Sequence, residues 1–131
     1  MTREKTMKRK RVGYFEGTDP AVLSSLICDG CDTIPVSNGL DNHGQHVRLI
    51  NEDTKVDVLM GYLHKIDAPL GDDTQPEDIF HICQTYQIQF LMIVPGELHD
   101  CAREKFEKCP DVVQFVDPAD LLDTARKILK D

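Results

Sequence analysis

The chain has 131 residues, of which 40% are hydrophobic and 29% charged, and its formal net charge at pH 7 is −8. This length suits one domain with a buried core and is too short for two ordinary domains. No apolar run approaches the ~18 residues that a membrane span needs, and the basic start of the chain lacks the apolar segment of a secretion signal. We therefore expect a single cytoplasmic domain that does not enter a membrane.

Positive charge is concentrated at the start of the chain. Six of the fifteen basic residues lie within residues 3–11, where Glu4 is the only acid. The rest of the chain is strongly acidic, and such a body repels nucleic acid and anionic membrane surfaces, so we expect neither as a partner. Residues 1–10 are predicted as a basic, solvated tail and residues 11–131 as the folded domain. The sequence leaves open whether this domain forms homo-oligomers.

The five cysteines are an odd number in a chain without an export signal, which favours reduced thiols. Cys83 and Cys101 fall on predicted helix faces, where a cysteine behaves as a small hydrophobic residue. We therefore expect no disulfide framework.

The first part of the chain predicts two strands separated by a helix. Residues 11–15 are apolar enough for a strand. A helix is predicted over residues 20–28, because Asp19 can accept hydrogen bonds from its first amides and a proline follows at the first helical position. Residues 33–36 predict a second strand. Pro35 cannot donate to a neighbour, which places this strand at an edge or keeps it short.

The second part of the chain alternates strands with helices. Apolar runs predict three further strands, over residues 56–63, 90–94 and 112–116. Three further helices are predicted. The capping-box spacing from Thr74 to Glu77 begins one that runs to about Tyr86, and prolines mark the starts of the other two, over residues 97–108 and 118–129. Residues 47–55 fit neither a helical nor a strand period, and residues 67–73 are predicted as a loop.

Strands that alternate with helices indicate an α/β fold. We expect a three-layer sandwich, with a five-stranded, mainly parallel sheet and helices on both of its faces. Right-handed crossovers favour the strand order 2-1-3-4-5. In outline this arrangement is similar to the flavodoxin-like and Rossmann-like architectures, a likeness of architecture alone, since no family motif is present.

The loop over residues 37–46 concentrates the most reactive side chains, with a hydroxyl, amides, a carboxylate and two imidazoles. Open α/β sheets bind ligands beyond the carboxyl ends of their strands, where the strand order reverses. At that edge this loop meets the loop after the first strand and the residues after the third. The predicted ligand-binding residues are Thr18, Asp19, Ser37, Asn38, Asp41, His43, His46 and His64.

A divalent metal is one candidate occupant. The spacing Asp41-x-His43-x-x-His46 offers a carboxylate and two imidazoles, which suit Zn, Fe, Mn or Ni. A zinc-finger arrangement that adds Cys28 and Cys31 is not expected, because these cysteines precede the second strand whereas the histidines follow it.

The common nucleotide and hydrolase motifs are absent. The sequence has no Gly-x-Gly-x-x-Gly after the first strand, no phosphate loop ending in Gly-Lys-Ser/Thr and no Gly-x-Ser-x-Gly elbow. Gly17-Thr18 before a helix is a modest signal for an anion site, but Arg48 and Lys65 are nearly the only cations expected nearby. A cation or a neutral polar ligand is therefore favoured over a phosphate.

Two function classes follow from these patterns. The first is a small α/β domain that binds a polar small molecule or a divalent metal through the 37–46 loop, with or without catalysis. The alternative is a non-catalytic regulatory or protein-interaction module that binds through its acidic body or basic tail. The crowded loop favours the first, and the lack of a catalytic motif favours the second.

Overall fold

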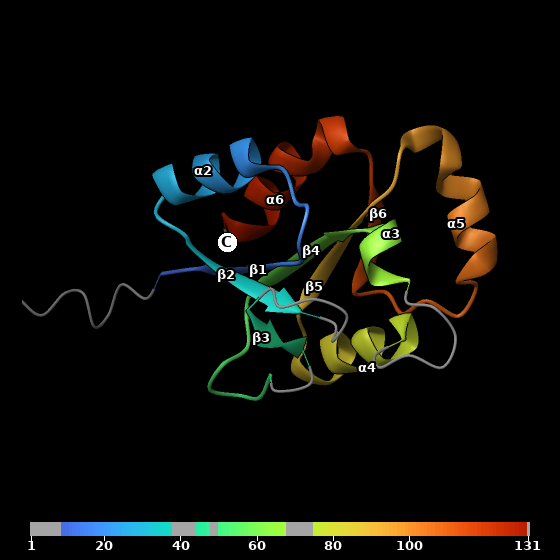
Figure 1. Cartoon of the computed structure of the whole chain (residues 1–131), viewed down its shortest axis with the longest axis horizontal. Coiled ribbons are helices and arrows are strands. Elements are labelled where there is room, and N and C mark those ends of the chain that lie inside the picture. Colours follow the sequence, from blue (N-terminus) through green and yellow to red (C-terminus); the bar gives the residue numbers. More distant parts are fainter. Residues whose placement is uncertain (1–8, 38–43, 48–49, 68–74, 131) are drawn as a thin grey trace, which may run out of the picture.

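The structure is a computed structural model that describes residues 9–37, 44–47, 50–67 and 75–130, residue 45 through its backbone alone. Its sheet has six strands, all paired in parallel, in the order β3-β2-β1-β4-β5-β6 (Figure 1). The strands are β1 (Arg11–Tyr14), β2 (Asp32–Ser37), β3 (Gln45–His46), β4 (Val58–Tyr62), β5 (Gln89–Ile93) and β6 (Val113–Val116). Without the two-residue β3, this is the predicted order 2-1-3-4-5, so the predicted α/β fold is confirmed.

Helices cover both faces of the sheet (Figure 1). One face packs against α2 (Pro20–Cys28) and α6 (Leu121–Leu129), and the other against α4 (Pro76–Tyr86) and α5 (His99–Lys105). Two 3-10 turns, η2 (Gly96–Leu98) and η3 (Pro118–Asp120), lead into α5 and α6. Among the helices within the described ranges, none combines the length and apolar character needed to cross a bilayer.

The two central strands separate two hydrophobic cores. On β4, Val58 and Met60 pack toward α2 and α6, whereas Leu59 packs toward α4 and α5. On β5, Leu91 belongs to the first core and Phe90 to the second. All five side chains are fully buried. Successive residues of a strand face opposite sides, so a strand covered by helices on both faces must be apolar throughout, which is the pattern the sequence showed.

Several predicted boundaries were wrong in detail. The strand predicted over residues 56–63 ends at Tyr62, where a single turn, α3 (Leu63–Ile66), begins. The helix predicted over residues 97–108 starts as the 3-10 turn η2 and ends at Lys105. Segments as short as α3 and β3 give no measurable period in a sequence, and α3 owes its position to the complete burial of Ile66.

Pro35 fits at the outer side of β2. Asp32 donates its amide to the carbonyl of Lys10, 2.9 Å away, which turns that amide toward β1. Backbone donors alternate along a strand, so the missing donor of Pro35 falls on the other side. There β3 pairs only with Val36 and Ser37, beyond the proline. The prediction of an edge strand or a very short one is therefore only partly right, because β2 has six residues and β3 lies outside its last two.

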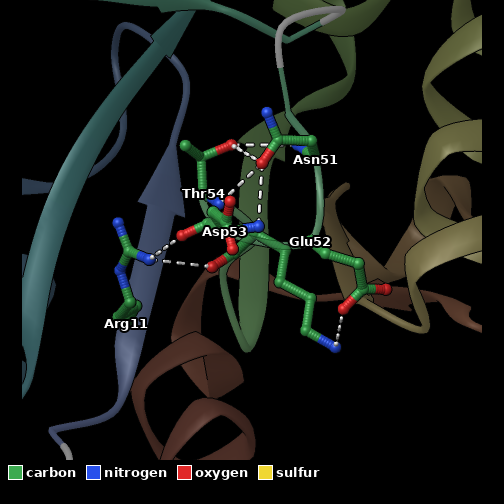
Figure 2. A network of polar contacts seen from close by, with 6 residues as sticks. Arg11, Asn51, Glu52, Asp53 and Thr54 are labelled. Atoms are coloured by element: carbon green, nitrogen blue, oxygen red, sulfur yellow. Dashed lines mark hydrogen bonds and ion pairs between the residues drawn. The ribbon is translucent and has the colours of Figure 1, made fainter.

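The stretch over residues 47–55 that showed no clear period contains a tight turn near the start of β1 (Figure 2). The Asn51 side chain accepts hydrogen bonds from the amides of Asp53 (2.8 Å) and Thr54 (3.1 Å). The Arg11 guanidinium donates to the carbonyls of Asp53 (3.4 Å) and Lys55 (3.3 Å). An asparagine that bonds the backbone ahead of it favours a turn over a helix or strand.

A substitution in β4 tests the packing of the second core. A methyl group at Gly61 would lie 2.8 Å from Phe15 Cδ2 and 3.1 Å from Ile66 Cδ1, both in buried side chains. We expect Gly61→Ala to lower the free energy of unfolding by about 1–3 kcal/mol, measured by urea denaturation. Ser24→Ala, on the exposed side of α2, is the control and should change it by less than about 0.5 kcal/mol. Equal stabilities for the two variants would contradict this packing.

Candidate functional site

The strand order reverses between β1 and β4. The chain runs from β1 outward to β2 and β3, then crosses back to β4 on the other side of β1 (Figure 1). Ligand sites of open α/β sheets lie at such a reversal, beyond the carboxyl ends of the strands. In this chain the reversal is flanked by residues 15–19 after β1 and by α3 after β4.

The residues after β1 form a braced turn. Thr18 is 6% exposed and donates its hydroxyl to the Phe15 carbonyl at 2.7 Å. Asp19 caps α2, since its carboxylate accepts a hydrogen bond from the Ala21 amide at 2.9 Å. Gly17 has φ +90°, a conformation that other residues rarely adopt. Two predicted ligand residues, Thr18 and Asp19, therefore have structural partners within the loop itself.

A phosphate is disfavoured at the start of α2. Helix N-termini bind anions through exposed amides and a favourable dipole. Here a carboxylate of the chain, that of Asp19, already occupies this position. The capping role predicted for Asp19 agrees with this geometry.

An ion pair spans the strand reversal. Lys65 of α3 lies 3.3 Å from the Glu16 carboxylate, and the lysine side chain passes over Gly17. Their side chains are 35% and 49% exposed, so solvent screens the pair and its contribution to stability is small. The ring of the exposed His64 lies 5.8 Å from that of Tyr62, at the end of β4.

Ser37 and His46 lie opposite each other at the carboxyl ends of β2 and β3. Ser37 is 3% exposed, whereas His46 is half-buried. The remaining predicted ligand residues, Asn38, Asp41 and His43, lie outside the described residues. The proposed metal set is therefore represented in the structure by His46 alone, and within the described ranges no three His, Cys, Asp or Glu side chains are grouped to hold a metal.

The other half of the same edge contains a brace that local sequence patterns do not predict. Asp117 accepts hydrogen bonds from the amides of Gly96 (2.7 Å) and Ala119 (3.0 Å). These two bonds, with a smaller effect of the charge of His99, hold the pKa of the Asp117 carboxyl below its usual range. The helix-capping role of Asp117 could be predicted from the proline that follows it. The bond to Gly96 could not, because it joins two loops that are distant in sequence.

His99 is anchored beside this brace. Its Nε2 lies 2.8 Å from the Val94 carbonyl, and because a carbonyl only accepts, this nitrogen carries the proton and donates. The ring also lies 6.2 Å from that of Phe115. His99 therefore fastens the start of α5 to the end of β5.

Cys31 lies away from His46, the one histidine of the 37–46 loop within the described residues. All five thiols are unpaired. Cys31 directly precedes β2, whereas His46 lies opposite the last residue of β2, so the two side chains belong to opposite edges of the sheet. Burial raises the pKa of the Cys83 thiol to about 12, as expected for a core cysteine. The expectation of a similar role for Cys101 was wrong, because this residue is exposed on α5.

Comparison with known proteins assigns no family. No protein-family model matches the chain, and no curated protein matches it. The function of this protein is therefore inferred from its own residues and contacts.

The cap of α2 can be tested by substitution. We expect Asp19→Ala to lower the free energy of unfolding by about 1 kcal/mol, because the first amides of the helix lose their acceptor. Asp19→Asn should retain most of the stability, since asparagine caps about as well as aspartate. Urea denaturation of the two variants measures the difference. An alanine variant as stable as the asparagine variant would rule out the cap.

The Asp117 brace predicts a pH dependence. A folded-state pKa below that of the unfolded chain gives stability that is fully present above the unfolded pKa and is lost as pH falls through the folded pKa. The stability advantage of the wild type over Asp117→Asn should therefore shrink on acidification below the usual range of aspartate. Urea denaturation across a pH series measures this, with the exposed Asp111→Asn as the control. An advantage that does not change with pH would contradict the prediction.

Proposed function

We propose that this protein binds a small polar molecule or a divalent metal ion at the carboxyl edge of its sheet, through the 37–46 loop. The supporting observation is the convergence of polar residues on the strand reversal. Ser37 and His46 end β2 and β3, while Thr18 and His64 follow β1 and β4. Four neighbouring strands thus deliver a hydroxyl or an imidazole to one edge.

The charges at this edge favour a cation or a neutral molecule. An anion would need amides or cations with no other partner. The start of α2 is capped by the Asp19 carboxylate, and Lys65 is paired with Glu16. Among the residues described at this edge, the helix start and the lysine that could hold a phosphate are therefore already engaged by carboxylates of the chain.

A metal would use the spacing of the loop. Asp41, His43 and His46 supply one carboxylate and two imidazoles within six residues, the ligand types preferred by Zn, Fe, Mn and Ni. A bound metal would supply a Lewis acid. A polar molecule would instead use the hydroxyl of Ser37 and the imidazole of His46 for hydrogen bonding, with a histidine available as a general base.

Metal analysis and thermal-shift screening test the proposal. The purified chain is assayed for bound Zn, Fe, Mn and Ni, and then screened against these ions and a panel of polar small molecules. A ligand at 100 times its Kd stabilises a one-site protein by about 2.7 kcal/mol, which such a screen detects. We expect His43→Ala and His46→Ala each to abolish the shift.

His81→Ala is the matched control. This histidine is exposed on α4, away from the strand reversal, and its loss should leave the shift unchanged. If no ion or molecule gives a shift that depends on His43 or His46, the proposal fails. The interaction-module alternative would then be tested by asking whether deletion of residues 1–10 abolishes partner capture.

A further inference from the structure

A cavity of about 950 Å³ opens at the amino edge of the sheet, opposite the site proposed above. It lies where the carboxyl ends of α2 and α6 meet the start of β1, and these two helices run side by side over one face of the sheet (Figure 1). Its volume is at the upper end of the range of small-molecule sites, roughly 300–1,000 Å³.

The floor of this cavity is apolar. Leu26, Cys31 and Leu129 contribute to it, and they are 0%, 6% and 8% exposed. Burial, with the nearby charge of Asp29, raises the pKa of the Cys31 thiol, so at neutral pH this group is an uncharged part of the floor.

The rim of the cavity is rich in cations, although the chain as a whole is acidic. The chain has fifteen basic residues, and five of them line the cavity together with two carboxylates. Two of the five are held by partners within the chain. Arg9 lies 2.9 Å from the Asp32 carboxylate and also donates to the Cys31 carbonyl, while Arg126 donates twice to Asp29, at 2.8 and 3.4 Å.

Three lysines remain, Lys10, Lys127 and Lys130. None of them has an ion pair with any other residue that the structure describes. The carboxylate of Asp123 offsets one of these charges, and the carboxyl ends of α2 and α6, at about half a negative charge each, offset roughly another. Counted over the residues that the structure describes, the rim therefore keeps about one positive charge after Asp123 and the two helix ends are subtracted.

We propose that this cavity binds a small organic monoanion that has an apolar body. The apolar floor would take the body, and the lysine rim would take the acid group. The basic segment over residues 1–8 is a poor occupant, because it has three cations and one carboxylate and the rim repels it. An inorganic anion is also a poor occupant, because it would leave the apolar floor in water.

Anilinonaphthalene sulfonate is a probe of this chemistry, since it joins an aromatic body to one sulfonate and fluoresces when bound. We expect the full 131-residue chain to bind it saturably at one site. The double variant Lys127→Glu, Lys130→Glu should raise the Kd roughly tenfold, because it reverses two exposed charges of the rim. Amide NMR shifts should appear at Gly30 and Cys31.

Lys108→Glu is the matched control, an exposed lysine that does not line the cavity, and should bind as the wild type does. Neutral phenylnaphthylamine and inorganic sulfate, each having one half of the probe's chemistry, should bind more weakly. An unchanged Kd in the double variant, or shifts at Ser37 and His46 instead, would overturn the proposal. Loss of probe binding as the chain self-associates would assign the cavity to a second copy and also overturn it.

The two proposals fail separately. His43→Ala and His46→Ala should leave probe binding unchanged, because Ser37 and His46 lie at the carboxyl ends of their strands, whereas the cavity opens at the amino edge of the sheet. Conversely, the double lysine variant should leave metal or ligand shifts at the carboxyl edge intact.

Discussion

Burial of β4 and β5 on both faces is the constraint on which the rest of this fold depends. Leu59, Met60, Leu91 and Met92 are fully buried, and their side chains alternate between two separate cores. Each core requires its own pair of helices, and parallel strands require crossovers that place helices on both faces. The three layers follow from this requirement. Because helices cover both faces of the sheet, the polar loops lie at its two edges.

The sequence predicted those parts of the fold that depend on long apolar patterns. The run from Phe90 to Val94 could only be a central strand, and Asp19 followed by Pro20 located the start of α2 to the residue. The capping-box spacing from Thr74 to Glu77 predicted the start of α4 one residue early, because the capping box is formed by Gln75 and Asp78. The elements that the sequence did not predict are short ones. A single turn such as α3 has too few residues to display a period, and it is held by the burial of Ile66 against distant side chains.

The candidate sites were predictable to different degrees. The candidate site at the carboxyl edge could be proposed from the sequence. Strand order determines which loops meet there, and the polar 37–46 loop is one of them. The amino-edge cavity was not. Its rim depends on Asp29 binding Arg126, 97 residues away, and on Arg9 reaching Asp32. Contacts between side chains so far apart follow from how α2 and α6 pack, which a local pattern does not encode.

The position of Pro35 has a consequence for the behaviour of this protein at high concentration. A parallel sheet ends in rows of unpaired donors and acceptors, and such a row can template the strand of another molecule. On the outer side of β2, Pro35 removes one donor, and the two residues of β3 cover the positions just beyond it. A strand from a second molecule would thus find an interrupted ladder along β2, which disfavours aggregation through this edge.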